Sequence, residues 1–166
     1  MTTKETKELL ARSVAFVNEH RDAYLRSGGR SGHIIDCTAV GARGYLPSLL
    51  LQTIGRKSGK TNIVPLLYGC FAGEWLVVGS RGGAPEHPAW FLNLQSRPEV
   101  HFQIATQAFR GSWRIPVGEE RDQAWAYVTN MFPSYAEYQK RTERQIPVVL
   151  LRPIEETPVF EPLTEA

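Results

Sequence analysis

The feature that most constrains the fold of this chain is a series of short apolar segments separated by glycine-containing breaks. The segments are rich in β-branched, leucine and aromatic residues, as β-strands are. They cover residues 33–40, 47–54, 63–71, 75–80, 100–105, 108–116 and 146–151. Gly73 divides the third and fourth segments into a hairpin, and the fifth and sixth form another, although the link at 106–107 lacks glycine. Consecutive strands joined by short turns favour an antiparallel barrel over a doubly wound parallel sheet.

Four helices are expected around this barrel, which makes the fold mainly β within the α+β class. They cover residues 4–26, 88–95, 119–131 and 134–141. The first has an apolar stripe made by Leu10, Val14, Val17, Tyr24 and Leu25. Such a helix packs on the core, covers a site or touches a membrane surface, and packing is the favoured interpretation.

A chain of 166 residues is expected to form one domain. It would comprise the N-terminal amphipathic helix over 1–30, the barrel core over 33–153 and a frayed tail over 154–166. No apolar run reaches eighteen residues, and the N-terminus lacks a secretory pattern. We therefore expect a cytoplasmic protein, with membrane association left open.

Charge and cysteine usage exclude several functions. A formal net charge of +2 is too small to indicate nucleic-acid binding. Cys37 and Cys70 both lie in strand-like runs, which predicts buried structural thiols, although a disulfide between them stays open. Neither the cysteines nor the four histidines have metal-ligand spacing, so no metal is expected.

The segment GRKSGKT at 55–61 brings together three cations and a hydroxyl. It resembles a phosphate-binding P-loop, but only three residues separate Gly55 from Gly59, and an extended apolar run follows in place of a helix. We reject that interpretation. A glycine-flanked turn between strands remains, in which Arg56 and Lys57 could hold an anion. The alternative is a solvated basic hairpin tip.

A second segment, SRGGAPEHPAW at 80–90, joins a strand end to a helix and extends to Asn93. Its backbone amides and helix start could receive an anion or the polar edge of a ring. Trp90 and Asn93, three residues apart, could share one helical face. They could instead be a core tryptophan and an asparagine that satisfies local backbone.

A third segment repeats aromatic residues every three positions, at Phe132, Tyr135 and Tyr138. One aromatic helix face could line a substrate pocket or simply pack on the core. The motifs GxSxG, HExxH and GxGxxG are absent from the sequence. An enzyme of this kind would therefore depend on a cofactor for its chemistry.

In this order and spacing, three stretches resemble the deazaflavin-dependent nitroreductase family of split β-barrel oxidoreductases. They are LLLQTIGRKSGKTNIVPLLY (49–68), GSRGGAPEHPAWFLNL (79–94) and FPSYAEYQKRTERQIPVVLL (132–151), and the resemblance spans 48–153. It implies a split β-barrel that binds reduced coenzyme F420 and passes a hydride to a quinone, a nitroaromatic compound or a similar small acceptor.

The resemblance also implies roles for individual residues. The positions that match coenzyme contacts are Arg56, Lys57, Ser58, Asn62, Ile63, Val64, Pro65, Leu66, Leu67, Tyr68, Val78, Gly79, Ser80, Arg81, Gly82, Gly83, Ala89, Trp90 and Asn93. Ser80, Tyr135 and Tyr138 are the expected catalytic residues, which would polarise or protonate the acceptor, with solvent as the alternative proton source.

Three positions depart from the family pattern. Asn62 stands where arginine is frequent, Arg81 where lysine is frequent and Phe132 where tyrosine is frequent. The changes at Asn62 and Arg81 affect the expected phosphate contacts, and the change at Phe132 affects the expected activity on nitro compounds. A split barrel could also hold FMN, or act as a non-enzymatic carrier of flavin, haem or lipid. A homodimer and contact between the N-terminal helix and a membrane surface remain open, and no nucleic-acid partner is expected.

Overall fold

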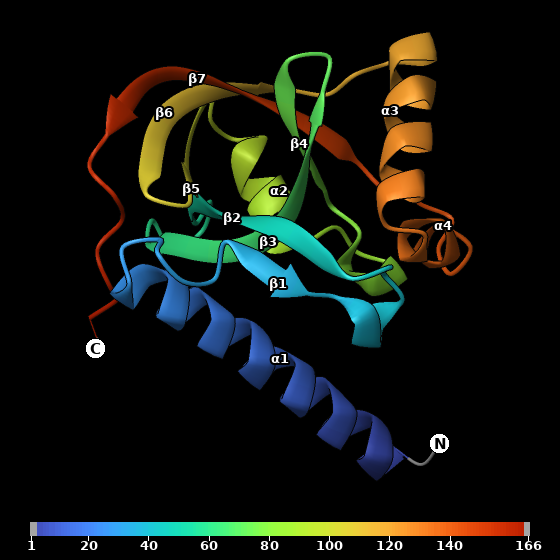
Figure 1. Ribbon diagram of the computed structural model, residues 1–166. Helices are drawn as coiled ribbons and strands as arrows, with labels where there is room; N and C mark the ends of the chain where they lie inside the picture. The colour runs from blue at the N-terminus through green and yellow to red at the C-terminus, as the bar shows by residue number, and fades with distance from the viewer. Residues whose placement is uncertain (1–2, 165–166) are drawn as a thin grey trace.

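The computed structural model describes residues 3–164 and contains a sheet of seven strands together with four α-helices in that range (Figure 1). In chain order the elements are α1 (Thr3–Arg26), β1 (Ile34–Asp36), η1 (Thr38–Val40), β2 (Tyr45–Ile54), β3 (Thr61–Phe71), β4 (Glu74–Val78), η2 (Arg81–Gly83), α2 (Ala89–Leu94), β5 (Glu99–Ile104), β6 (Gln107–Arg114), α3 (Gly118–Met131), α4 (Ser134–Gln139) and β7 (Val148–Thr157).

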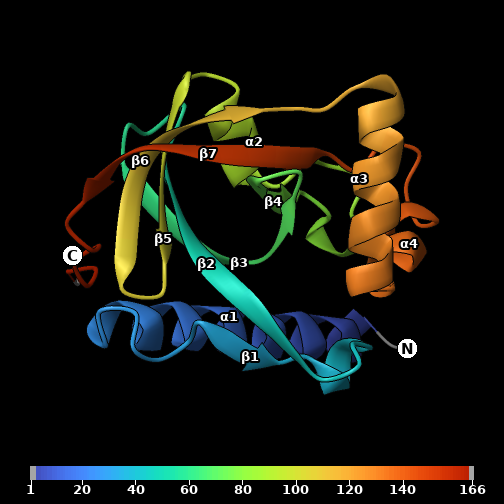
Figure 2. The ribbon, with the colours of Figure 1, turned by 45° about the horizontal axis from the view of Figure 1, so that its top comes forward.

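The sheet closes on itself as a barrel. Its strand order is β1-β2-β3-β4-β7-β6-β5, and every pairing is antiparallel. The long strand β2 pairs with β3 on one side and with β5 on the other, and the β2–β5 pairing closes the barrel. Strand β1 pairs with β2 and lies outside the closed ring of strands. Figure 2 shows α1 along one side of the barrel and α3 with α4 at one end. The predicted antiparallel split barrel is confirmed.

Two apolar layers follow from the alternation of side chains along β7. Val149 and Leu151 belong to a cluster that includes Phe102 and the α2 residues Trp90 and Phe91. Their neighbours Val148 and Leu150 belong to the cluster that packs α3 and α4 against the sheet. Because successive strand residues face opposite sides, one strand can hold both layers together. The inner layer fixes α2 against the barrel, next to the cavity described below.

The C-terminal part of α1 is anchored by a buried tyrosine. The Tyr24 hydroxyl donates to the carbonyl oxygen of Ser48 (3.0 Å) and accepts from the backbone N–H of Ala105 (2.8 Å). Burial raises the pKa of Tyr24 to about 12, so the phenol keeps its proton. The predicted apolar stripe is only partly correct, because Val14 is 59% exposed and Val17 is 40% exposed. The side chain of Leu10 lies outside the described residues.

Several boundaries correct the sequence-based predictions. The strand expected over 33–40 is limited to β1, because η1 and a left-handed Gly41 (φ 94°) turn the chain away. The tail expected to fray from residue 154 instead continues as β7 to Thr157, since β6 supplies a pairing partner for it. Beyond β7, Phe160 is buried and its N–H donates to the Gln103 side chain (2.7 Å).

The cysteine prediction is half correct. Cys37 is buried, and the hydrophobic burial raises the pKa of its thiol. Cys70 lies in β3 as expected but is exposed, near the end of the strand. Both thiols are free.

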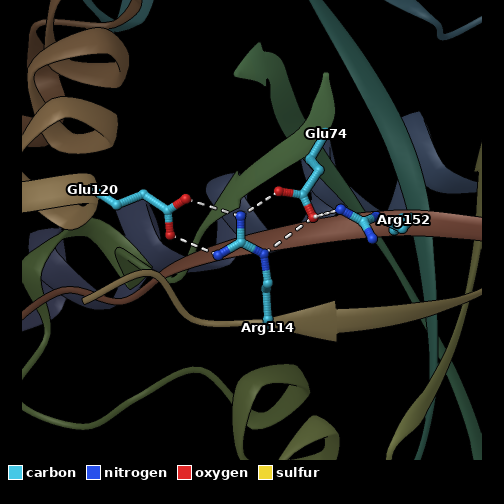
Figure 3. A network of polar contacts seen from close by, with 4 residues as sticks. All are labelled: Glu74, Arg114, Glu120 and Arg152. Carbon is cyan, nitrogen blue, oxygen red and sulfur yellow. Dashed lines mark hydrogen bonds and ion pairs between the residues drawn. The ribbon is translucent and has the colours of Figure 1, made fainter. Parts of the chain in front are cut away.

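An ion-pair network ties α3 to the sheet (Figure 3). The Glu74 carboxylate on β4, 5% exposed, accepts two hydrogen bonds from Arg114 on β6 and lies 3.5 Å from Arg152 on β7. Arg114 also donates to both carboxylate oxygens of Glu120 on α3, at 2.6 and 3.0 Å. The two cationic partners offset the desolvation cost of burying the Glu74 carboxylate, which an isolated carboxylate would bear in full.

Within residues 3–164, no helix combines the length and the apolar character needed to cross a membrane.

Candidate functional site

A cavity of about 750 Å³ lies where the turn between β2 and β3, the loop around η2 and the helix α2 come together. Its lining residues are Thr53, Gly55, Arg56, Lys57, Ser58, Asn62, Ile63, Val64, Arg81, Glu86, His87, Pro88, Ala89, Trp90, Leu92 and Asn93. The volume falls within the range of roughly 300–1,000 Å³ that is usual for sites of small ligands and cofactors.

The segment GRKSGKT at 55–61, called the basic turn below, is a compact structure held by its own backbone. The N–H of Gly55 donates to the Lys60 carbonyl and the N–H of Gly59 to the Gly55 carbonyl, both at 2.8 Å. Gly59 adopts φ +69°, a conformation that glycine takes without steric cost. The strand β3 follows directly, which agrees with the rejection of a P-loop. The turn therefore presents the side chains of Arg56 and Lys57 to the cavity.

Asn93 connects this turn to α2 and β2. Its Oδ1 accepts from the backbone N–H of Arg56 (3.1 Å) and from Arg56 Nη1 (3.2 Å). Its Nδ2 donates to the Thr53 hydroxyl (3.2 Å). The residue is 5% exposed, so these three bonds satisfy an amide that is removed from solvent. Asn93 is thus a structural link as well as a cavity-lining residue, because its side chain bonds to residues outside its own helix.

The loop around η2 forms the opposite rim. Arg81 lines the cavity and lies 3.5 Å from Glu86 across exposed surface. Gly83 is buried with φ +82°, and a Cβ at this position would lie 2.4 Å from the Tyr138 carbonyl oxygen. Only glycine permits this close approach between the loop and α4. The helix α2 begins at Ala89, one residue later than predicted.

The strand predicted to run beside the ligand lines the cavity only at its start. Asn62, Ile63 and Val64 face the cavity, whereas the residues that follow, Pro65, Leu66, Leu67 and Tyr68, do not. The amide of Asn62 donates to the Lys60 carbonyl (3.0 Å), so it is used within the turn. Tyr68 is buried and its hydroxyl lies 2.7 Å from His33 Nε2.

The backbone segment predicted to contact a ring lies next to the cavity. Of Val78, Gly79, Ser80, Arg81, Gly82 and Gly83, only Arg81 lines the cavity. The carbonyl oxygens of Gly79 and Ser80 accept hydrogen bonds from Arg144, at 3.1 and 2.7 Å. These bonds hold the segment in place from the side of β7.

The two tyrosines of α4 form a cluster with Phe132, which follows the end of α3. Phe132, Tyr135 and Tyr138 contact one another, with ring centroids 4.9 to 6.4 Å apart. Tyr135 is 5% exposed, and burial raises the pKa of its phenol. Neither tyrosine lines the cavity, and neither does Ser80. The three expected catalytic residues therefore do not line this cavity, with Tyr138 half-buried and Tyr135 within the core.

Sequence reasoning missed several lining residues: Thr53, Gly55, Glu86, His87, Pro88 and Leu92. All six lie within the two stretches whose neighbours were singled out, so proximity in sequence was the available signal. Arg144 was also missed. It belongs to the third stretch, but nothing in its local sequence indicates contact with a loop more than fifty residues away.

The cavity has two chemically different parts. Arg56, Lys57 and Arg81 supply positive charge along its rim. Ile63, Val64, Pro88, Ala89 and Trp90 supply an apolar wall. Guanidinium and ammonium groups bind phosphate and carboxylate through charge-assisted hydrogen bonds. The arrangement suits an elongated ligand with an anionic tail and a flat apolar ring.

The sequence profile of the F420H(2)-dependent quinone reductase family matches residues 16–153. Two Mycobacterium tuberculosis relatives are similar to this chain. The F420H(2)-dependent quinone reductase Rv1261c is 34% identical over 141 residues, which cover 83% of this chain and 90% of the relative. Rv3178, a second relative named for the same activity, is 39% identical over 120 residues, which cover 69% of this chain and 96% of its own.

Two solved structures are similar in sequence and shape. An F420-H2 dependent reductase, FDR-A, is 38% identical with a TM-score of 0.58, over 64% of this chain and 94% of that one. A structure described as a domain-swapped dimer is 34% identical with a TM-score of 0.60, over 84% of this chain and 99% of that one.

Proposed function

The chain belongs to the F420H(2)-dependent quinone reductase family, and we propose that its 750 Å³ cavity holds reduced coenzyme F420 for hydride transfer to a quinone. As a member it is an oxidoreductase, and coenzyme F420 is its cofactor. The observation that carries the proposed site is the combination of three rim cations with an apolar wall in one cavity.

The residues present fit the coenzyme. Arg56, Lys57 and Ser58, exposed on the basic turn, would hold its phosphate and acidic tail. Arg81, on the facing rim, would add a fourth polar contact. Asn62 lacks the charge that an arginine would bring, so the other cations would make up the anion site. Because Asn93 already fixes Arg56, less conformational entropy is lost when the anion binds.

The apolar wall would hold the ring system. Ile63, Val64, Ala89 and Trp90 would enclose its faces, with Asn93 below them. The backbone of 78–83 would meet the polar edge of the ring. The remaining β3 positions, Pro65 to Tyr68, would act by shaping the strand, since their side chains do not line the cavity.

When bound, the reduced coenzyme supplies a hydride, and a quinone that gains this hydride and a proton becomes a quinol. The protein binds, orients and excludes water. Ser80 and Tyr138 are the groups that would meet an acceptor, because Tyr138 is half-buried whereas Tyr135 is in the core. A phenol whose pKa is raised by burial is a weak acid, so Tyr135 would shape the acceptor site and solvent would supply the proton.

The acceptor is proposed to be a quinone, with nitro compounds reduced more slowly. Phe132 leaves this chain with two phenols on α4, where a tyrosine would provide a third. Comparing a soluble quinone with a nitroaromatic compound under the same conditions tests this order. Faster reduction of the nitroaromatic compound would reverse it.

Contact with a membrane surface is proposed for α1. Val14, Phe16 and Val17 are 59%, 58% and 40% exposed, which is unusual for large apolar side chains on one helix. Liposome flotation should detect binding that Phe16→Glu with Val14→Glu abolishes. Truncation before Gly28 is a poorer test, because Tyr24 and Leu25 belong to the core. Equal flotation of both proteins would exclude this contact.

We further propose that the chain acts in the cytoplasm as a homodimer. The similar structure described as a domain-swapped dimer supports the oligomeric part. Light scattering after gel filtration should give twice the mass of the 18.7 kDa chain. A monomer mass across the working concentration range would contradict it.

The decisive experiment is a fluorescence titration of the purified protein with coenzyme F420, in parallel with FMN. Saturable binding of F420, with weaker binding of FMN, is expected. Tighter FMN binding would favour an FMN-dependent oxidoreductase. Binding without hydride transfer to any acceptor would favour a carrier of flavin, haem or lipid.

A further inference from the structure

Arg144 lies in the connection between α4 and β7 and uses nearly all of its hydrogen-bonding capacity on one loop. Its Nε donates to the Ala84 carbonyl (2.8 Å), Nη1 to the Gly79 carbonyl (3.1 Å) and Nη2 to the Ser80 carbonyl (2.7 Å). Nη1 also lies 3.1 Å from His87 Nδ1. Four of the five N–H groups that a guanidinium carries are thus engaged across the segment 79–87.

This set of contacts determines which backbone groups of the loop can face the cavity. The carbonyl oxygens of Gly79, Ser80 and Ala84 are all directed at Arg144. The positive guanidinium offsets the partial negative charge of these carbonyl oxygens, so they repel an anionic ligand in the cavity less strongly. Without Arg144, the Gly79 and Ala84 carbonyls would lose this donor and the Ser80 carbonyl would keep only the Gly83 N–H (2.9 Å), so the loop would be freer to turn these acceptors toward a ligand.

The contact with His87 also determines the proton position on the imidazole ring. A guanidinium has only donors, so the Nδ1 atom that faces it must be unprotonated. The neutral ring then carries its proton on Nε2. His87 lines the cavity beside Arg81 and Glu86, which leaves Nε2–H as the donor that this ring can offer to a ligand. The Phe91 ring packs on the imidazole, with centroids 4.9 Å apart, and restricts its rotation.

Arg144 is itself held by its own segment. Gln139 Nε2 donates to the Arg144 carbonyl (2.8 Å), and Gln139 Oε1 accepts from the Ile146 N–H (2.9 Å). These bonds fix the backbone on both sides of the arginine. A second arginine of the segment, Arg141, makes one longer hydrogen bond to the loop, 3.3 Å from Nη1 to the Gly82 carbonyl, and its guanidinium lies over the Tyr138 ring.

We propose that Arg144 is a positioning residue that sets the loop 79–87 and the tautomer of His87, and that His87 Nε2–H donates a hydrogen bond to the coenzyme bound in the cavity. The second half of this proposal rests on the proposed function. The first half concerns the protein alone and is tested without any ligand.

The first test measures the His87 tautomer by long-range ¹H–¹⁵N NMR correlation in the unsubstituted protein at neutral pH, without coenzyme. The expected pattern is that of a neutral ring protonated at Nε2. A ring protonated at Nδ1 overturns the proposal, and this outcome does not depend on how any variant folds. In Arg144→Met the Nε2–H pattern should give way to a mixture of both tautomers, whereas Arg141→Met, the matched control, should keep it. If Arg144→Met keeps the pattern of a ring protonated at Nε2, Arg144 does not set the His87 tautomer and the proposal is overturned.

The second test adds coenzyme F420 to the same samples. The His87 Nε2 resonance should shift on saturation, and Arg144→Met should bind the coenzyme at least about tenfold more weakly, while Arg141→Met stays within about twofold. If F420 binds the unsubstituted protein but the Nε2 resonance does not move, the role of His87 as a donor fails and the proposed function stands. If F420 does not bind at all, the proposed function fails together with that role, whereas the tautomer result still decides the positioning role of Arg144.

Discussion

A single amide oxygen, Asn93 Oδ1, accepts hydrogen bonds from both the backbone N–H and the guanidinium of Arg56, at 3.1 and 3.2 Å. The two residues are 37 positions apart, one at the start of the basic turn and the other in α2. The bond makes the position of the anion-binding turn depend on the helix that forms the apolar wall. The two halves of the proposed coenzyme site are therefore fixed relative to each other before any ligand binds.

Replacing Asn93 with alanine should weaken coenzyme binding. The substitution leaves the Arg56 N–H and the Thr53 hydroxyl without their partner, and a lost hydrogen bond of this kind costs about 1–3 kcal/mol. Fluorescence titration with F420 should show the loss. The exposed Gln95 at the end of the same helix serves as control, and Gln95→Ala should bind normally. Equal affinity of the two variants for F420 would mean that Asn93 does not contribute to coenzyme binding.

Lys57→Ala should weaken F420 binding by about 1–3 kcal/mol, because a charge-assisted contact with the anionic tail is lost. Lys60→Ala is the matched control: it removes the same charge from the same turn, but Lys60 does not line the cavity. A comparable loss in both variants would mean that the turn acts through its overall charge and not through a specific contact. The salt dependence of binding should separate these cases, since distant charges are screened more strongly.

Gly29→Ala should destabilise the fold far more than Gly28→Ala. Both glycines have positive φ, 61° and 86°, which costs an alanine about 1–2 kcal/mol. Around Gly28 a Cβ would meet nothing within 4 Å, whereas at Gly29 it would lie 1.7 Å from the Ala105 carbonyl oxygen. Urea unfolding should show a difference of at least about 1–3 kcal/mol between the variants. Similar stabilities would show that α1 can shift away from the turn between β5 and β6.

Glu74→Ala should lower the free energy of unfolding by about 1–3 kcal/mol, because Arg114 loses two hydrogen bonds to a buried carboxylate, while both arginines stay partly exposed to solvent. Glu120→Ala, which removes the exposed carboxylate on the same arginine, should cost about 0–1 kcal/mol. Chemical denaturation of the two variants compares a buried and an exposed ion pair within one network. If both variants lose the same stability, the burial of Glu74 does not set the strength of the network.

Stability should fall as the pH drops below about 6.5, the ordinary pKa of histidine, in part through His33. Burial lowers the pKa of His33 below its usual value, and burial and the nearby Arg144 charge do the same for His87. The unfolded chain therefore binds more protons in this range, so stability is present above the unfolded pKa and is lost as the pH falls. Denaturation at several pH values should show a smaller slope for His33→Gln. An unchanged slope would exclude His33 as a contributor.

Much of the fold was predictable because it depends on local pattern. The β-branched, leucine and aromatic content of β2 to β7 and the glycine turn at Gly73 indicate hairpins, and consecutive hairpins favour an antiparallel barrel. The errors occur where pairing decides the outcome. The residues after Asp36 have strand-like composition but no partner in the sheet, whereas residues up to Thr157 find one in β6. At these positions a strand forms where a neighbouring strand is available to pair with it, whatever the composition of the segment.

The sequence by itself determined which chemistry is available to this protein. The cations of the basic turn and the apolar residues near Trp90 indicate an anion site beside an apolar surface, and the similarity of three ordered stretches to the deazaflavin-dependent family implies the cofactor, because residue type and local spacing are written in the chain. Only the tertiary structure decided which of those residues face the cavity, and that Tyr135 is buried while His87 lines the wall. It also decided that Arg144 holds the loop 79–87, since a contact between residues some sixty positions apart depends on the pairing of β4 with β7, which no local pattern records.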